Sequence, residues 1–205
     1  MADASRRHRP RLIVMLKAPQ PGQVKTRLGH DIGMVGAAWW MRHQIRALLR
    51  NISDPRWDLA LAIAPDTAIR APIWPAGLPR LAQGQGDLGT RMARALRQAP
   101  PGPTCLIGAD IPALRRPHIA RAFAALGRAD AVFGPARDGG YWLIGLRHGG
   151  AVPASLFRNV RWSSPDALRD SIASLPGARI ALVDTLADVD NAADLAAHRR
   201  LGFSR

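Results

Sequence analysis

Glutamate is absent from this 205-residue sequence, so all 15 acidic side chains are aspartate. Lysine is also scarce: Lys17 and Lys25 are the two lysines, and every other basic residue is arginine. Any carboxylate chemistry therefore belongs to aspartate. Because arginine replaces lysine elsewhere, two lysines in one short segment, LKAPQPGQVKTRL, indicate a specific role for the ammonium group there.

Cysteine and long apolar runs are scarce as well. Cys105 is the single cysteine, which excludes an intramolecular disulfide. Its apolar neighbours in TCLIGA predict a buried thiol rather than a nucleophile, because such surroundings raise the pKa of a thiol. No uncharged run reaches the roughly 18 residues of a membrane span, and the apolar run before Lys17 is too short for a signal peptide. We expect a cytoplasmic protein without stable membrane insertion.

The chain is strongly basic, with a net charge of +14 and a pI near 11.7. Such a charge favours anionic partners, including nucleic acid. The arginines, however, are spread from Arg6 to Arg205 among Ala, Leu and Pro rather than among stacking aromatics. This pattern indicates compositional bias rather than a nucleic-acid surface, and it favours a small phosphate-bearing ligand.

Apolar runs alternate with helical patterns along the chain. Strands are predicted at 11–16, 58–64, 103–109, 129–134, 141–146 and 178–184, and helices at 33–50, 88–98, 116–127, 165–174 and 192–200. This alternation predicts a single-domain α/β fold over residues 11–205, with a mainly parallel central sheet and helices on both faces. Residues 1–10 are predicted to be a basic tail, and 65–80 an irregular connection. Ligands of such sheets bind beyond the carboxyl ends of the strands.

The loop after the first strand carries the two lysines. Its prolines and Gly22 exclude a helix and predict a stiff turn at the strand end. Lys17, Lys25 and Arg27 can then reach one site, lysine as a point charge for phosphate and arginine as a bidentate donor. The alternative is a solvated basic turn, which the scarcity of lysine makes the weaker interpretation.

Asp110 lies in GADIP, directly after a predicted buried strand. A carboxylate at that position points toward the ligand edge of the sheet. Magnesium and manganese prefer carboxylate oxygens and commonly bridge to phosphates, so Asp110 is the first candidate metal ligand. A strand-closing turn or a helix cap is the rival explanation.

Asp138 precedes two glycines in ARDGGYWLIGL. Asp-Gly-Gly is a strong turn signal, so a simple loop feeding a strand explains it well. Adjacent glycines also leave room for a ligand against the backbone. On that second interpretation, Asp138 binds a substrate hydroxyl or acts as a general base.

Asp188, Asp190 and Asp194 lie in LADVDNAADL. One of them, most plausibly Asp190, could supply a second metal ligand. Asp190 or Asn191 is equally placed to cap the following helix, with Asp194 in its first turn, and from the sequence alone the cap is the simpler interpretation.

Asp87 and Arg91 lie in QGQGDLGTRM, whose glycine spacing matches neither the dinucleotide-binding fingerprint nor a P-loop. Asp87 is well placed to cap the next helix. Arg91 could face the phosphate site, although a solvated helical arginine is the simpler interpretation.

Six motifs in this order resemble a bacterial family of nucleotide-diphospho-sugar transferase-like proteins: KAPQPGQVKTRL, QGQGDLGTRM, GADIPAL, GPARDGGYWLIGL, RWSSPDAL and DVDNAADL. Members of that family are often described as GT-A-type glycosyltransferases, some linked to arsenosugar biosynthesis. The resemblance covers residues from about 11 to about 202. It implies a GT-A-like nucleotide-binding fold, with a nucleotide loop after the first strand and a divalent metal at an acidic strand end.

Carried over by position, the resemblance assigns Lys17, Lys25 and Arg27 to the nucleotide phosphates and Asp110 to the metal. The resemblance also implies that Asp190 is a second metal ligand, which could cap the helix as well. GADIP offers one carboxylate where many GT-A enzymes have Asp-x-Asp, and Asn191 stands where related sequences often have Thr.

The leading functional hypothesis is a metal-dependent glycosyltransferase. It would use Mg²⁺ or Mn²⁺, a nucleotide-diphosphate sugar as donor and a small-molecule acceptor, with Asp110 and Asp138 as catalytic residues and Gly22, Asp87 and Arg91 completing the nucleotide site. A nucleotidyltransferase that releases pyrophosphate is the alternative, although the GGxSxRMG loop of many such enzymes is absent. A non-catalytic anion-binding protein is the third hypothesis.

Overall fold

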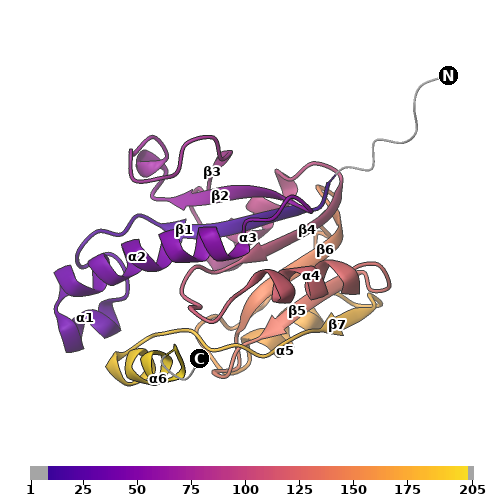
Figure 1. Cartoon of the computed structure of the whole chain (residues 1–205). Helices are drawn as coiled ribbons and strands as arrows, with labels where there is room; N and C mark the ends of the chain where they lie inside the picture. Colours follow the sequence, from indigo (N-terminus) through magenta and orange to yellow (C-terminus); the bar gives the residue numbers. More distant parts are fainter. Residues whose placement is uncertain (1–8, 203–205) are drawn as a thin grey trace.

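Strands and helices alternate along residues 9–202, the part of the chain that the computed structural model describes (Figure 1). In chain order the elements are β1 (Arg11–Lys17), α1 (Thr26–Ile32), α2 (Met34–Ile52), β2 (Asp58–Ala64), the 3-10 helix η1 (Asp66–Ala68), β3 (Arg80–Ala82), α3 (Leu88–Arg97), β4 (Gly102–Ile107), α4 (Arg116–Ala125), β5 (Ala131–Pro135), β6 (Tyr141–Gly149), α5 (Ala167–Ala173), β7 (Ile180–Leu182) and α6 (Ala192–Gly202).

The strands form one seven-stranded sheet in the order β3-β2-β1-β4-β6-β5-β7. β1 is parallel to both β2 and β4, and β7 is parallel to β5. β6 is antiparallel to its two neighbours, β4 and β5. The predicted mainly parallel α/β sheet is therefore confirmed, with one reversed strand.

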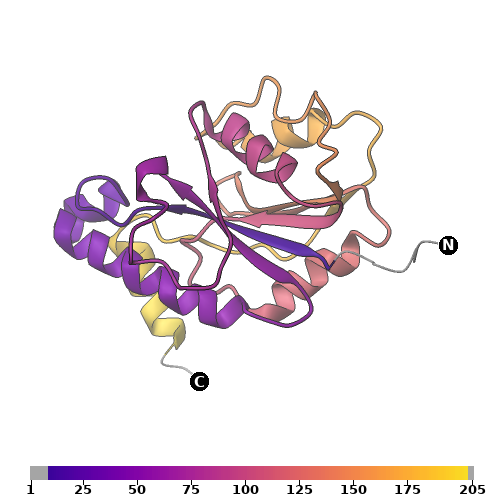
Figure 2. The ribbon, with the colours of Figure 1, turned by 90° about the horizontal axis from the view of Figure 1, so that it is seen from above.

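Two hydrophobic cores lie on opposite faces of the sheet. Along β1, Leu12, Val14 and Leu16 pack into one core and Ile13 into the other, because successive side chains of a strand point to opposite faces. α2 and α4 cover the first face, and α3 and α5 cover the second (Figure 2). Burial on both faces explains why the strands read as nearly continuous apolar runs.

Two elements differ from the sequence prediction. α1 is an additional helix between the predicted stiff turn and the helix predicted from residue 33. Gly29 lets it pack tightly against α2, since a Cβ there would lie 2.5 Å from the sulfur of Met34. β3 is a three-residue strand at the end of the proline-rich connection, and it pairs with β2. Both are too short to leave a periodic pattern.

Cys105 is fully buried, as predicted, and burial raises the pKa of its thiol. Within residues 9–202, none of the helices combines the length and the hydropathy that a transmembrane segment requires. Residues 1–8, most of the predicted basic tail, lie outside the described residues.

The edge at which β1 and β4 end is also the edge at which β6 begins. Ile107, the last residue of β4, pairs with Val14 of β1 and with Leu143 near the start of β6. The segments that follow β1, β4 and β5 therefore meet in one place, which is where the ligand edge of an α/β sheet is expected.

Candidate active site

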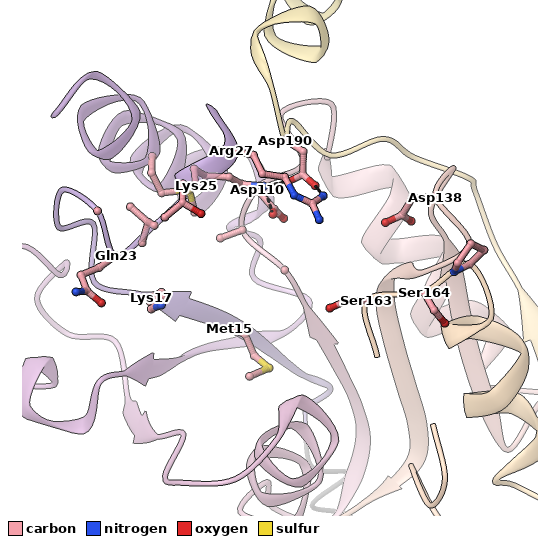
Figure 3. Close-up of a pocket in the computed structure, with 17 residues that line it drawn as sticks. Met15, Lys17, Gln23, Lys25, Arg27, Asp110, Asp138, Ser163, Ser164 and Asp190 are labelled. Atoms are coloured by element: carbon pink, nitrogen blue, oxygen red, sulfur yellow. Dashed lines mark hydrogen bonds and ion pairs between the residues drawn. The ribbon is translucent and has the colours of Figure 1, made fainter. Parts of the chain in front are cut away.

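A pocket of about 740 Å³ opens beyond the ends of β1 and β4 (Figure 3). The loop after β1 lines one side, and the β5–β6 turn with the 163–165 segment lines the other. The predicted site residues in its lining are Lys17, Gly22, Lys25, Arg27, Asp110, Asp138 and Asp190.

The loop after β1 turns sharply to present Lys25. Gly22 has φ 72°, a left-handed conformation that glycine adopts without steric cost. Lys25 itself has φ 46°, which costs a non-glycine residue on the order of 1–3 kcal/mol. Its carbonyl accepts the hydrogen bond of Gly29 that opens α1, and its side chain turns inward, with 10% of its surface exposed.

The Lys25 ammonium lies between two carboxylates. Its Nζ is 2.6 Å from Oδ2 of Asp110 and 2.6 Å from Oδ1 of Asp190. Burial acts to lower the pKa of Lys25, but the charge and hydrogen bond of Asp110 and then those of Asp190 outweigh it, so the pKa is raised. Arg27, which is exposed, adds a contact of 3.3 Å from Nη1 to Oδ2 of Asp190.

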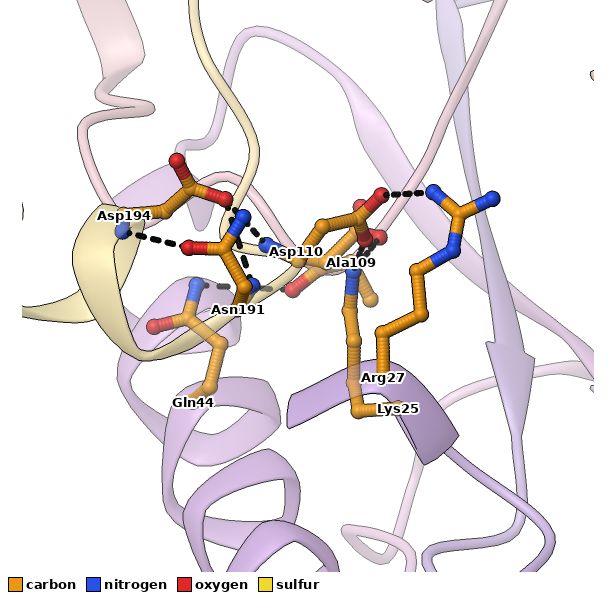
Figure 4. Close-up of polar contacts among 8 residues, drawn as sticks. Lys25, Arg27, Gln44, Ala109, Asp110, Asn191 and Asp194 are labelled. Atoms are coloured by element: carbon orange, nitrogen blue, oxygen red, sulfur yellow. Dashed lines mark hydrogen bonds and ion pairs between the residues drawn. The ribbon is translucent and has the colours of Figure 1, made fainter. Parts of the chain in front are cut away.

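Backbone hydrogen bonds hold the segment of Ala109 and Asp110 in place, and Figure 4 shows the one at Ala109. The carbonyl of Asp110 accepts a hydrogen bond of 3.1 Å from the amide of Val189, which joins the segment after β4 to the segment before α6. The buried Gln44 of α2 donates to the carbonyl of Ala109 at 3.4 Å. These bonds leave the Asp110 carboxylate free to face the pocket.

Asn191, not Asp190, caps α6. The Asn191 side chain accepts from the amide of Asp194 at 3.0 Å, and the Asp194 carboxylate accepts from the amides of Asp190 and Asn191. This reciprocal pattern is a capping box. The expectation that Asp190 could also be the cap is wrong, because its carboxylate contacts Lys25 and Arg27 instead.

Three carboxylates gather beside Lys25. Oxygens of Asp110, Asp188 and Asp190 lie within 4.8 Å of one another, and none of the three is fully exposed. Burial, followed by the charges of Asp110 and Asp190, raises the pKa of Asp188 to about 6. Such a cluster of hard oxygen donors fits a divalent cation such as Mg²⁺ or Mn²⁺, which would relieve the same repulsion that raises this pKa.

Asp138 lies across the pocket from the lysines. Its Oδ1 accepts a hydrogen bond from the amide of Gly140 at 2.9 Å, which closes the turn that the sequence indicated. Gly139 has φ 87°, and a Cβ there would lie 2.2 Å from the carbonyl oxygen of Pro165. The glycine therefore makes room for the neighbouring 163–165 segment, whereas room for a ligand was one of the two interpretations of the glycine pair.

Ser163 and Ser164 line the pocket, although no role was predicted for either. They belong to RWSSPDAL, which carried the family resemblance without any chemical assignment. Ser163 has φ 57°, a strained conformation that leaves no trace in the sequence. Asp188 lies in LADVDNAADL, where Asp190 was preferred over it as a second metal ligand. The structure places both aspartates in the cluster.

Asp87 and Arg91 lie outside the lining of this pocket. Asp87 caps α3, accepting from the amide of Thr90 at 2.8 Å. Arg91 contacts the Gln83 side chain and lines two smaller adjoining cavities, of about 230 and 210 Å³, that Lys17 also lines. Arg91 is thus near the site and Asp87 is not, and their predicted roles in nucleotide binding stay predictions.

Solved structures share this fold. A protein from Desulfovibrio desulfuricans G20, provisionally described as a nucleotide-diphospho-sugar transferase, is 29% identical and superposes with a TM-score of 0.87, over 96% of this chain and 88% of its own. The 4-diphosphocytidyl-2C-methyl-D-erythritol synthase from Anaerococcus prevotii is 9% identical, with a TM-score of 0.60 over 94% of this chain and 96% of its own.

A manganese complex of Rv0371c from Mycobacterium tuberculosis H37Rv is 15% identical and gives a TM-score of 0.51, over 96% of this chain and all of its own. At such low identity the last two likenesses establish the fold and not the reaction. None of these three names concerns arsenosugars, so that part of the resemblance stays a prediction.

No curated protein sequence matches the chain significantly. Residues 48–164, more than half of the chain, match the model of a family described as uncharacterized protein conserved in bacteria. The residues matched run from the end of α2 through β4, Asp110 and Asp138 to Ser164, whereas the lysine loop and Asp190 lie outside the match. The chain therefore belongs to the DUF2064 family.

Proposed function

We propose that this protein is a metal-dependent glycosyltransferase that uses a nucleotide-diphosphate sugar as donor. The observation that carries the proposal is the meeting of two opposite charges in one pocket. The cations Lys17, Lys25 and Arg27 come from the end of β1, the loop after it and the start of α1, and carboxylates of the three-aspartate cluster contact Lys25 and Arg27. The pocket, about 740 Å³, falls within the range of small-molecule sites. The provisional description of the Desulfovibrio protein supports the same donor class.

Donor binding falls to the lysine loop. Lys25 and Arg27 would bind the diphosphate, with Lys25 exchanging its carboxylate contacts for phosphate oxygens. Mg²⁺ or Mn²⁺ held by Asp110, Asp188 and Asp190 would supply charge neutralisation for the diphosphate leaving group. Because the loop and the cluster are preformed, this charge stabilisation needs little rearrangement at the moment of reaction.

Acceptor activation falls to Asp138. Its Oδ1 is held by the Gly140 amide, so the carboxylate is oriented, and the residue lies on the opposite side of the pocket from Lys17 and Lys25 (Figure 3). We assign it the proton of the acceptor hydroxyl, which Oδ2 would accept as that oxygen attacks the sugar.

A nucleotidyltransferase would use the same pocket differently. The synthase from Anaerococcus prevotii shares the fold, which is why this second candidate is kept. The two reactions break different bonds: a glycosyltransferase releases a nucleoside diphosphate, whereas a nucleotidyltransferase consumes a triphosphate and releases pyrophosphate. Product analysis therefore separates them.

Thermal stabilisation by a panel of nucleotide sugars and nucleoside triphosphates, each with Mn²⁺ and with chelator, tests the proposal. A ligand at about 100 times its Kd adds about 2.7 kcal/mol of stability. We expect stabilisation by one nucleotide sugar that needs the metal and is lost in Asp110→Asn. Asp54→Asn, which removes a carboxylate that pairs with Arg56 and lies outside the lining of the pocket, is the matched control. Preference for a triphosphate, with pyrophosphate as product, would replace the glycosyltransferase by the second candidate.

A further inference from the structure

A second cavity, of about 250 Å³, adjoins the pocket on the side of Asp138. The two share Gly108, Asp110, Asp138 and the two serines of the 163–165 segment, so a molecule in one can touch a molecule in the other. Whole sites for drug-sized ligands occupy about 300–1,000 Å³, so this cavity accommodates one ring and not a whole larger molecule.

The walls of this cavity are largely apolar. Leu88 and Met92 come from α3, and Trp162 comes from the segment before α5. Trp162 lies against α3, because a Cβ on Gly89 would be 2.7 Å from its ring, and its ring meets that of Phe157 at 5.7 Å. Leu88 keeps 44% of its surface exposed although it is a large hydrophobic residue. An exposed leucine beside a fixed indole is a surface on which a ring can pack.

The charged residues of the cavity are all acidic. Asp110, Asp138 and Asp188 line it, and none of the described lining residues is lysine, arginine or histidine. Lys17, Lys25 and Arg27 all line the larger pocket instead. A divalent cation held by the aspartate cluster would offset two of these negative charges but would leave that of Asp138. An anionic group in this cavity would therefore face the Asp138 carboxylate, with no cationic side chain among the lining residues to bind it.

From this we propose that the second cavity binds the acceptor, and that the acceptor is an uncharged hydroxyl compound with an apolar ring packed against Leu88, Met92 and Trp162. This inference rests on the proposed glycosyl transfer. In that transfer the acceptor oxygen bonds to the anomeric carbon, and the bond from that carbon to the diphosphate breaks with its electron pair on the diphosphate. The hydroxyl proton passes to the Asp138 carboxylate. Phosphorylated acceptors are excluded by charge.

Two probes that differ by one phosphate test this. Binding of phenyl glucoside and of phenyl glucoside 6-phosphate is measured by ligand-detected NMR with Mg²⁺. We expect phenyl glucoside to bind, with the strongest saturation at its phenyl protons, and the 6-phosphate to bind at least tenfold more weakly. Equal or tighter binding of the 6-phosphate, or no binding of phenyl glucoside, would overturn the inference.

Substitutions in the second cavity test whether the preference between the two probes arises there. Leu88→Arg places a cation in the cavity and is expected to improve binding of the 6-phosphate at least tenfold, whereas Val35→Arg adds the same charge at an exposed position of α2 and should change nothing. An equal gain in both variants would overturn the inference. Trp162→Ala is expected to weaken binding of phenyl glucoside at least fivefold.

Donor binding is followed in the same samples by thermal shift. Loss of metal-dependent stabilisation by nucleotide sugars, with the probe preference intact, would count against the proposed function. Intact donor binding together with tight binding of the 6-phosphate would count against the acceptor class alone.

Discussion

Nζ of Lys25 lies 2.6 Å from Oδ1 of Asp190, although 165 positions separate the two residues in the chain. The contact joins the loop after β1 to the segment before α6, with Asp110 of the β4 loop as the third partner. The ammonium lies against the same oxygens that a divalent cation would use. Lysine and metal are therefore expected to compete for these carboxylates.

Replacing Lys25 with methionine should separate metal binding from activity. Because the competing ammonium is gone, we expect Lys25→Met to bind Mn²⁺ about tenfold more tightly, a gain of about 1.4 kcal/mol. Activity should fall by about 100-fold or more, since the diphosphate loses a positioned donor. Isothermal titration with Mn²⁺ and product assays measure the two effects. Lys17→Met, which removes an exposed lysine at the end of β1, should leave Mn²⁺ affinity unchanged. Weaker Mn²⁺ binding by Lys25→Met would contradict the competition.

Asp188→Asn should stabilise the metal-free protein at neutral pH. The pKa of Asp188 is raised from 3.8 to about 6, so the folded state disfavours its charge, and this penalty is absent below pH 4 and complete above pH 6. We expect Asp188→Asn to gain about 1 kcal/mol at pH 7.5 in chelator, after allowance for solvent exposure, and nothing at pH 3.5. Urea denaturation at both pH values measures this. The same variant should lose Mn²⁺ affinity, and an equal gain at both pH values would contradict the explanation.

The helix caps offer a matched pair of substitutions. Asn191→Ala removes the cap of α6 next to the cluster, and Asp87→Ala removes the cap of α3 outside the pocket. Each is expected to cost about 1 kcal/mol of stability. Only Asn191→Ala should weaken Mn²⁺ binding, because it loosens the segment that holds Asp190. A similar loss of metal affinity in both variants would show that the effect is general destabilisation.

Gly139→Ala should lower the stability of the fold for two reasons. The new methyl group would lie 2.2 Å from the Pro165 carbonyl oxygen, and alanine would have to adopt φ 87°. We expect a loss of about 2–4 kcal/mol, combining backbone strain with overpacking. Gly177→Ala is the control, since Gly177 has φ 76° and open space around it, and it should show the backbone strain alone. Thermal unfolding measures both. Equal losses would mean that the 139–165 contact contributes little.

Much of the fold could be predicted from the sequence because its long strands are buried on both faces. β1 and β2 read as apolar runs, and β2 was predicted with its observed bounds, 58–64. β3 could not be found, since three residues carry no period and the strand exists by pairing with β2. The reversal of β6 was not predicted, although the six residues between the predicted strands 129–134 and 141–146 are too few for the crossover that parallel strands need.

The site residues that directly follow a strand could be predicted, because their position along the strand places them at the ligand edge of the sheet. Asp110 follows a buried strand, and the lysines follow another, so their meeting at one edge could be expected. Which of Asp190 and Asn191 caps α6 could not be predicted, because the answer depends on which side chain turns toward Lys25, a residue far away in the sequence. Ser163 was missed because its left-handed backbone, with φ 57°, is not signalled by its residue type.

The reversed strand β6 has an evolutionary consequence. β5 and β6 are joined by a tight turn and not by a crossover helix. Asp138 and part of the wall of the adjoining cavity therefore belong to a hairpin and the 163–165 segment, whereas the lysine loop follows β1. Under the proposed glycosyl transfer, substitutions in the hairpin would change the acceptor side of the pocket and leave the donor side, at the lysine loop, unchanged. On that proposal, related proteins would keep one donor while differing in their acceptors.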